Sequence, residues 1–313
     1  MIKNGGESTG MTEQKQQEQD MLVRGTAWGG KIRVFAARTT ALTEELRRRH
    51  GTFPTATAAL GRTATAGAMM GAMLKGKEKL TIQVRGDGPI GQIVVDANAD
   101  GEVRGYVEHP QVHLASNPSG KLDVAGAVGR SGHIHVIKDL GMKEPYSGSV
   151  PIISGELGED FTYYFASSEQ TPSAVGLGVL VDVDGTVLHA GGFILQLMPG
   201  MEDADIERLE QKLAAMPHVT ALLDQGESPD EILRFIVGDD LQVHDTMPIV
   251  FQCKCSNERV EQTLISLGES ELKQLIEEEG QAEVVCHFCN EKYVFDRPHL
   301  ENLLDQAKPK PIH

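Results

Sequence analysis

The segments MPIVFQCKCS (247–256) and AEVVCHFCNEKYVF (282–295) decide the organisation of this 313-residue chain, because they hold all of its cysteines. The cysteines form two close pairs, Cys253-x-Cys255 and Cys286-x-x-Cys289. Thiolates are compact ligands that suit tetrahedral zinc, and two close pairs separated by a small folded insert can close around one ion. The sequence therefore predicts a site in which these four cysteines hold one Zn²⁺ per chain.

The unit that carries the cysteines, about residues 246–298, has few apolar residues to stabilise it. Its first segment reads as a strand or turn and its second as a hairpin with cysteines at the bend, with two short helices between them. Such small units need a staple, and structural zinc supplies about 10–16 kcal/mol of apparent folding energy. We therefore predict a zinc-dependent fold, in which His287 is a bystander, followed by a tail at 299–313.

A closed set of four cysteine ligands limits the chemistry of this unit. It leaves no open position for water or substrate, which disfavours Lewis-acid hydrolysis. Residues 246–313 carry 12 acidic and seven basic side chains, the opposite of a zinc ribbon that binds nucleic acid. The remaining chemistry is redox, because peroxide and hypochlorite attack thiolates, and each pair is close enough in sequence to form its own disulfide. A purely structural ribbon is the simplest alternative.

The preceding residues, 21–198, predict an α+β core domain built on a largely antiparallel sheet. Alternation over 22–37 predicts a hairpin with a Gly-Gly turn, and helices are expected over 40–49 and 53–76. Because the strands follow one another in runs, parallel βαβ alternation is absent. Further strands are predicted at 80–86, 90–98, 102–108, 133–139, 148–154, 160–167, 176–184 and 187–198.

Small residues in the second helix predict unusually close packing. Gly61, Gly67 and Gly71 each remove a side chain where a neighbour approaches the helix. The methionine cluster at 69–73 is interpreted as core packing, with a soft surface for apolar partners as the alternative.

Two patterns in the core have a functional and a structural interpretation. Residues 86–91 match G-x-G-x-x-G, but Pro89 and the β-branched run after it indicate a hairpin turn and not a dinucleotide loop. His133-x-His135 is either half of a metal site or a surface pair, and the surface pair is favoured because no third ligand is indicated. The core has neither G-x-S-x-G nor H-E-x-x-H, so no active site is predicted.

Residues 199–245 change to short, charged amphipathic helices and predict a helical linker. The clearest helix begins at Ser228-Pro229-Asp230-Glu231, which supplies an N-cap residue, a proline at the first helical position and a glutamate at N3. Helices this short are marginal unless they dock on a neighbour. The linker is therefore either a rigid spacer or a segment that melts when its neighbour is lost, and the residues leave both interpretations open.

Charge and the N-terminal segment restrict the class of protein. The chain has 29 basic and 45 acidic residues, a net charge of −16, which repels a phosphate backbone. Residues 1–20 are polar, lack a signal-peptide core and are predicted to be a disordered extension. The longest uncharged helical stretch, 63–74, is well short of the roughly 20 residues of a membrane span. We expect a cytoplasmic protein with neither a membrane nor a nucleic-acid partner.

The chain resembles the heat shock protein 33 family of redox-regulated chaperones over about residues 21–298. Besides the cysteine pairs and the run CHFCN, four stretches carry the resemblance. They are AARTT (36–40), RRHGTFPTATAALGRT (48–63), DFTYYFASSEQTPS (160–173) and AGGFILQLMPG (190–200).

The resemblance implies a holdase chaperone, a protein that prevents aggregation without catalytic turnover and is not an enzyme. It implies an inactive, zinc-bound reduced form. Oxidation then pairs Cys253 with Cys255 and Cys286 with Cys289, releases zinc, unfolds the linker and permits a homodimer. The oxidised form binds unfolding client proteins and passes them to downstream foldase chaperones. Two rivals are a constitutive zinc-ribbon binding module on a separate catalytic domain and an oxidoreductase that cycles an exposed CxxC pair.

Overall fold

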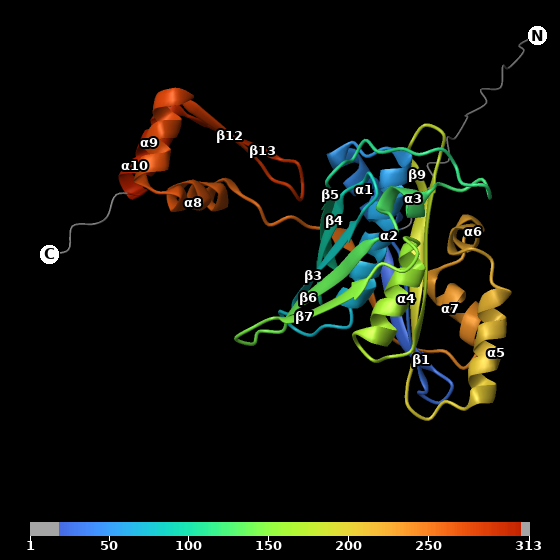
Figure 1. Cartoon of the computed structure of the whole chain (residues 1–313). Coiled ribbons are helices and arrows are strands. Elements are labelled where there is room, and N and C mark those ends of the chain that lie inside the picture. The colour runs from blue at the N-terminus through green and yellow to red at the C-terminus, as the bar shows by residue number, and fades with distance from the viewer. Residues whose placement is uncertain (1–18, 308–313) are drawn as a thin grey trace, which may run out of the picture.

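One helix, α2 (Pro54–Gly71), runs between two β-sheets at the centre of the molecule (Figure 1). The computed structural model describes residues 19–307. All residues of α2 except Pro54 and Arg62 are buried, as in a helix covered on every side. Pro54 at the first turn is suited to a helix start, because its missing N–H would have no partner there.

The two large sheets are antiparallel apart from one short pair. The first has the strand order β10-β1-β2-β9-β8, and the second has the order β11-β5-β4-β3-β6-β7, in which β11 runs parallel to β5. The strands of the first are β1 (Met21–Ala27), β2 (Ile32–Arg38), β8 (Ser173–Val181), β9 (Val187–Leu197) and β10 (Gln242–Pro248). Those of the second are β3 (Lys79–Gly86), β4 (Gln92–Asn98), β5 (Glu102–Val107), β6 (Gly132–Asp139), β7 (Tyr146–Pro151) and β11 (Val250–Phe251).

The remaining elements are helices and one hairpin. The hairpin consists of β12 (Gln281–Val285) and β13 (Lys292–Asp296). The helices are α1 (Thr40–His50), α3 (Val124–Val128), α4 (Leu157–Ser167), α5 (Asp203–Ala214), α6 (Val219–Asp224), α7 (Pro229–Val237), α8 (Asn257–Leu267), α9 (Glu269–Glu278) and α10 (Arg297–Ala307). The predicted α+β class with a largely antiparallel core is confirmed.

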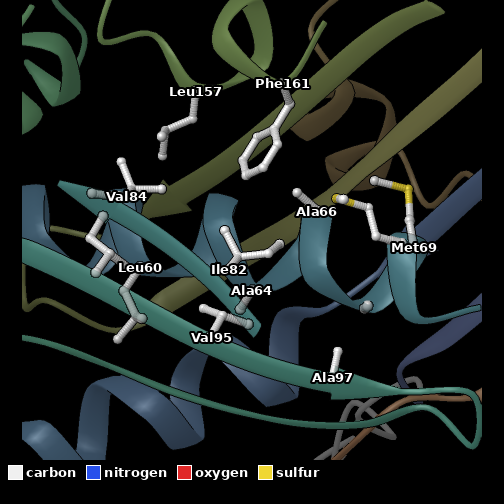
Figure 2. Packing of buried hydrophobic residues seen from close by; sticks show 14 of the residues in the cluster. Leu60, Ala64, Ala66, Met69, Ile82, Val84, Val95, Ala97, Leu157 and Phe161 are labelled. Atoms are coloured by element: carbon white, nitrogen blue, oxygen red, sulfur yellow. The ribbon is translucent and has the colours of Figure 1, made fainter. Parts of the chain in front are cut away.

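The glycines of α2 permit the close packing that the sequence predicts. A Cβ on Gly67 would lie 2.8 Å from Val95 of β4, and a Cβ on Gly71 would lie 2.7 Å from the Asn98 carbonyl oxygen. Met69 is completely buried, which confirms the methionines as core residues. Figure 2 shows side chains of α2, such as Leu60 and Ala64, packed against residues of β3, β4 and α4. The residues that it labels on these elements include Ile82, Val84, Val95, Leu157 and Phe161.

The prediction of a strand over 160–167 is wrong, because these residues lie in α4. Phe, Tyr and Thr favour strands locally, so composition alone indicates a strand here. The helical period decides instead: Leu157, Phe161 and Phe165, each four residues apart, are all buried against the core. The two predicted glycine turns are confirmed, since residues 28–31 join β1 to β2 and residues 87–91 join β3 to β4.

Asp20, the last residue of the predicted extension, is buried and caps helix α1. Its carboxylate accepts hydrogen bonds from the backbone N–H groups of Leu42 (2.7 Å) and Ala41 (3.1 Å). Burial raises the pKa of Asp20 to about 6, against the lowering effect of these two bonds. Residues 1–18 of the predicted extension lie outside the described residues.

The short helices α5, α6 and α7 cover the face of the five-stranded sheet that points away from α2 (Figure 1). Each contributes buried residues to one apolar cluster, including Leu209, Leu222 and Ile232. Helix α7 begins as predicted, with the Ser228 N–H donating to the Glu231 carboxylate at 2.7 Å. The chain then returns to the sheet, because β10 pairs with β1.

Helices α8, α9 and α10 and the β12–β13 hairpin form a separate, smaller body, which we call the cysteine module (Figure 1). Its apolar cluster has eight buried residues, and Phe295 is its largest. Helix α10 continues beyond residue 298 into the predicted tail, where Leu300 and Leu303 pack into this cluster. The predicted division into domains stays a prediction. Within residues 19–307, every helix is too short or too polar to span a bilayer.

Candidate metal centre

The four cysteines meet where the chain leaves the core and the β12–β13 hairpin turns. Cys253 and Cys255 follow β11, and Cys286 and Cys289 lie in the turn of the hairpin. Their four Sγ atoms lie within 4.8 Å of one another, and all four thiols are free. Sulfurs of different pairs approach closely, at 3.7 Å for Cys253 and Cys286 and 3.2 Å for Cys255 and Cys289.

This arrangement fits one tetrahedral ion with sulfur ligands. Zinc–sulfur bonds of about 2.3 Å place the sulfurs of a tetrahedral site about 3.8 Å apart, near the separations seen here. Among the described residues, no His, Asp or Glu joins the sulfur cluster. His287 is exposed beside it. The four sulfurs complete the set, so the arrangement can hold a metal and leaves it no open position.

Backbone hydrogen bonds shape the turn that carries the second pair. The Cys286 N–H donates to the Glu291 carbonyl at 2.9 Å, and the Asn290 N–H donates to the Cys286 carbonyl at 2.8 Å. Asn290 adopts a φ of 58°, in the left-handed region that asparagine tolerates better than most residues. The turn is therefore tight enough to bring two sulfurs three residues apart to one point.

The sulfurs differ in how easily they ionise. Burial raises the pKa of Cys253, but hydrogen bonds from Cys255 and Arg104 outweigh it and bring the pKa down to about 7. Burial raises the pKa of Cys289, which is the only buried sulfur of the four. The Tyr293 hydroxyl donates to the Cys255 sulfur at 3.0 Å, and this bond raises the pKa of Tyr293. Cys253 is thus the thiol most disposed to be a thiolate.

Comparison with known proteins places the whole arrangement in one family. The family model described as "Hsp33 protein" matches residues 20–296, which include all four cysteines and Asp20. The chain belongs to the Hsp33 family.

Relatives agree with this assignment over nearly the whole chain. The "33 kDa chaperonin" of Bacillus subtilis (strain 168) is 56% identical over 288 residues, which cover 92% of this chain and 99% of the relative. The "33 kDa chaperonin" of Geobacillus kaustophilus (strain HTA426) is 57% identical over 290 residues, with the same two coverages. The crystal structure of the 33 kDa chaperonin (heat shock protein 33 homolog) from Thermotoga maritima superposes with a TM-score of 0.87 at 39% identity, covering 92% of this chain and 98% of that one.

Two residues at the sulfur cluster of this Hsp33-family chain are not indicated by its cysteine spacing. Arg104 of β5 points its guanidinium at Cys253 Sγ from 3.7 Å, and Tyr293 of β13 bonds to Cys255. Tyr293 lies in the hairpin segment 282–295 and shares one strand face with buried Phe295, which indicates an inward-facing side chain but not a sulfur partner. Arg104 is 149 residues from Cys253 in sequence, so no spacing rule connects them.

The histidine pair of β6 does not form a metal site in this structure. His133 and His135 lie with ring centroids 5.8 Å apart, and His133 is exposed. The group of potential metal ligands found between residues 19 and 307 consists of the four cysteines alone. The predicted surface pair is confirmed.

Proposed function

We propose that this Hsp33-family chain is a redox-regulated holdase chaperone, with the four cysteines holding one Zn²⁺ in the reduced, inactive form. The observation that carries the proposal is the sulfur cluster: four free thiols within 4.8 Å, in a module with only eight buried apolar residues. Bound zinc supplies folding energy to the module. The chain is not an enzyme in this proposal, and it acts in the cytoplasm.

Oxidation acts on the cysteines themselves. Two thiolates reduce one molecule of hydrogen peroxide to two of water, taking up two protons, and are joined as a disulfide. A disulfide sulfur no longer has the thiolate charge that binds the metal, so the module loses its staple.

We propose that Cys253 pairs with Cys255, and Cys286 with Cys289. The spacing within each motif and the family resemblance support this pairing. In the reduced form the close approaches run between the motifs instead, at 3.7 and 3.2 Å. Pairing within the motifs therefore requires the sulfurs to leave their tetrahedral arrangement, as expected if oxidation and loss of the module's structure accompany each other.

The chain path links the sulfur cluster to the linker helices. Cys253 follows β11, which pairs with β5, and β11 follows β10, which pairs with β1. Loss of the module's fold therefore weakens the pairing of β11 with β5 and of β10 with β1, the two strands that connect the cysteines to α7. The linker helices then leave the sheet face that they cover, exposing apolar residues that include Val34, Phe193 and Leu195. Such a face suits binding of unfolding client proteins, and it supports a homodimer and transfer of clients to foldase chaperones.

Client aggregation measured by light scattering tests the proposal. Peroxide-treated, warmed protein should suppress aggregation of a thermally unfolding client at equimolar concentration, whereas the reduced protein should not. Zinc release, followed with a chromophoric chelator, should accompany activation at one ion per chain. Equal protection by the reduced protein contradicts the switch. A module that keeps both zinc and fold after oxidation favours the rival, a constitutive zinc ribbon.

A further inference from the structure

The outward face of β5 forms the contact between the core and the cysteine module. Along β5, alternate residues point into the core, and the other three point outward. Two of these contact the module, and the third contacts the segment that leads into it: Arg104 lies over Phe288, Tyr106 contacts Phe288 and His287, and Glu102 forms an ion pair with Lys254. A sheet face that is normally solvated is here occupied along the whole strand.

Phe288 is the centre of this contact, although it is not a candidate metal ligand. Its ring lies 4.0 Å from the Arg104 guanidinium and meets Tyr106 edge-on, with centroids 5.4 Å apart. The guanidinium is fixed by the Asp96 carboxylate, which accepts two hydrogen bonds of 3.0 and 2.7 Å. The core therefore presents a prearranged cation and an aromatic ring to one phenyl side chain.

The end of α1 holds the backbone on either side of that ring. The His50 ring donates to the Phe288 carbonyl at 3.2 Å, and Arg49 donates to the Cys289 carbonyl at 3.3 Å. These donors recognise main-chain carbonyls, which every polypeptide carries. The surface thus selects for an aromatic side chain followed by accessible backbone, a combination that folded proteins bury and unfolding proteins expose.

We propose that Arg49, His50, Arg104 and Tyr106, here called the β5 cage, form a binding site for aromatic side chains of unfolding client proteins. Phe288 occupies the cage as an internal ligand while the module is closed. Because Phe288 lies between Cys286 and Cys289, any change that joins those sulfurs reshapes its loop and empties the cage. The inference rests on the proposed chaperone function and names a client-binding surface for it.

The first test empties the cage without touching the sulfurs. The probe is a fluorescein-labelled peptide of residues 284–292 with both cysteines replaced by serine, and binding is followed by fluorescence anisotropy. Reduced full-length Phe288→Ala should keep one zinc per chain and bind the peptide at least tenfold more tightly than the reduced wild type. Val294→Ala, which truncates an exposed side chain of the same hairpin, should behave as the wild type. Equal affinity for Phe288→Ala and wild type overturns the proposal, as does equal binding of a peptide that lacks the phenyl ring.

The second test asks whether clients use the same surface. Oxidised Arg104→Ala/Tyr106→Ala should need at least threefold more protein than oxidised wild type to suppress client aggregation, whereas oxidised Arg130→Ala, on an exposed loop, should not. The labelled peptide should also compete with the client for oxidised wild-type protein, a measurement that needs no variant to fold. If oxidised wild type gives no protection, the proposed function fails. If it protects clients but neither the double variant nor the peptide changes that protection, the β5 cage is not a client site.

Discussion

The core and the cysteine module are stabilised in different ways. In the core, α2 is sealed between two sheets and contacts strands of both, and Figure 2 shows its packing against β3 and β4. The module has three helices and a two-stranded hairpin around eight buried residues. The core is stabilised mainly by this packing, whereas in the proposed function the module depends on a metal ion held by four sulfur atoms. In the proposed function, one chain thereby combines a permanent scaffold with a part whose stability changes on oxidation.

The largest expected effect is the loss of one sulfur from the module. Cys286→Ser should abolish zinc binding and remove about 10–16 kcal/mol of apparent stabilisation from the module. Hydrogen exchange should show α8, α9, α10 and the hairpin unprotected, with α2 still protected. His287→Ala, one residue away and outside the sulfur cluster, should keep both zinc and protection. A Cys286→Ser module that stays protected contradicts the dependence on the sulfurs.

A substitution in the core should lower the stability of the core and leave zinc binding unchanged. Phe161→Ala removes a completely buried ring that packs beside α2 and should cost about 3–5 kcal/mol in urea unfolding of the reduced protein. Zinc stoichiometry should remain one per chain, because no cysteine contacts this site. Tyr163→Ala, 38% exposed on the same helix, should cost much less. Loss of zinc from folded Phe161→Ala would show that the two regions are not independent.

The pH dependence of core stability should carry a contribution from Asp20. Its folded-state pKa of about 6 lies above the ordinary aspartate pKa of 3.8, so the folded state retains a proton that the unfolded state releases. The stability contributed by Asp20 is therefore complete below about pH 4 and is lost as pH rises through about 6, by about 3 kcal/mol in total. The difference in unfolding free energy between wild type and Asp20→Asn should fall over this range. Asp100→Asn, at an exposed turn, serves as the control, and a difference independent of pH refutes the assignment.

The smallest effect concerns the linker, which lies between the two regions in sequence. Ser228→Ala removes the N-cap side chain of α7 and should cost about 1 kcal/mol. Hydrogen exchange at α7 should accelerate by roughly fivefold, and activation by oxidant should become faster. Ser147→Ala, on the exposed strand β7, should leave both rates unchanged. Unchanged exchange at α7 would mean that its docking on the sheet, and not its cap, sets its stability.

Much of this fold follows from sequence because local pattern and tertiary packing agree. The β1–β2 hairpin, α2 and the close approach at Gly67 are of this kind. Helix α4 differs from its local signal, because its aromatic residues favour a strand and only burial of one helical face reverses that preference. β10 gave no strand signal, since nearly all its side chains are exposed and its pairing with β1 defines it.

The candidate site likewise has a part that the sequence predicts and a part that it does not. The cysteines are recognisable because ligand spacing is a local property of the chain. The β5 cage is not, because Arg104 and Phe288 meet only through the docking of the module on the core. Outward positions on β5 look like ordinary solvated residues until a partner covers them.

In the proposed switch, detachment of β11 on oxidation would leave a sheet edge uncovered. This two-residue strand covers the edge of the six-stranded sheet at Glu102 and Val103, directly before the first cysteine. Once it detaches, β5 presents unpaired amide and carbonyl groups at a sheet border, and such borders recruit strands from other chains. Return to the reduced form then depends on two competing rates. Re-pairing of β11 with β5 is intramolecular and independent of protein concentration, whereas self-association is not. Self-association of the oxidised form should therefore be least favoured at low protein concentration.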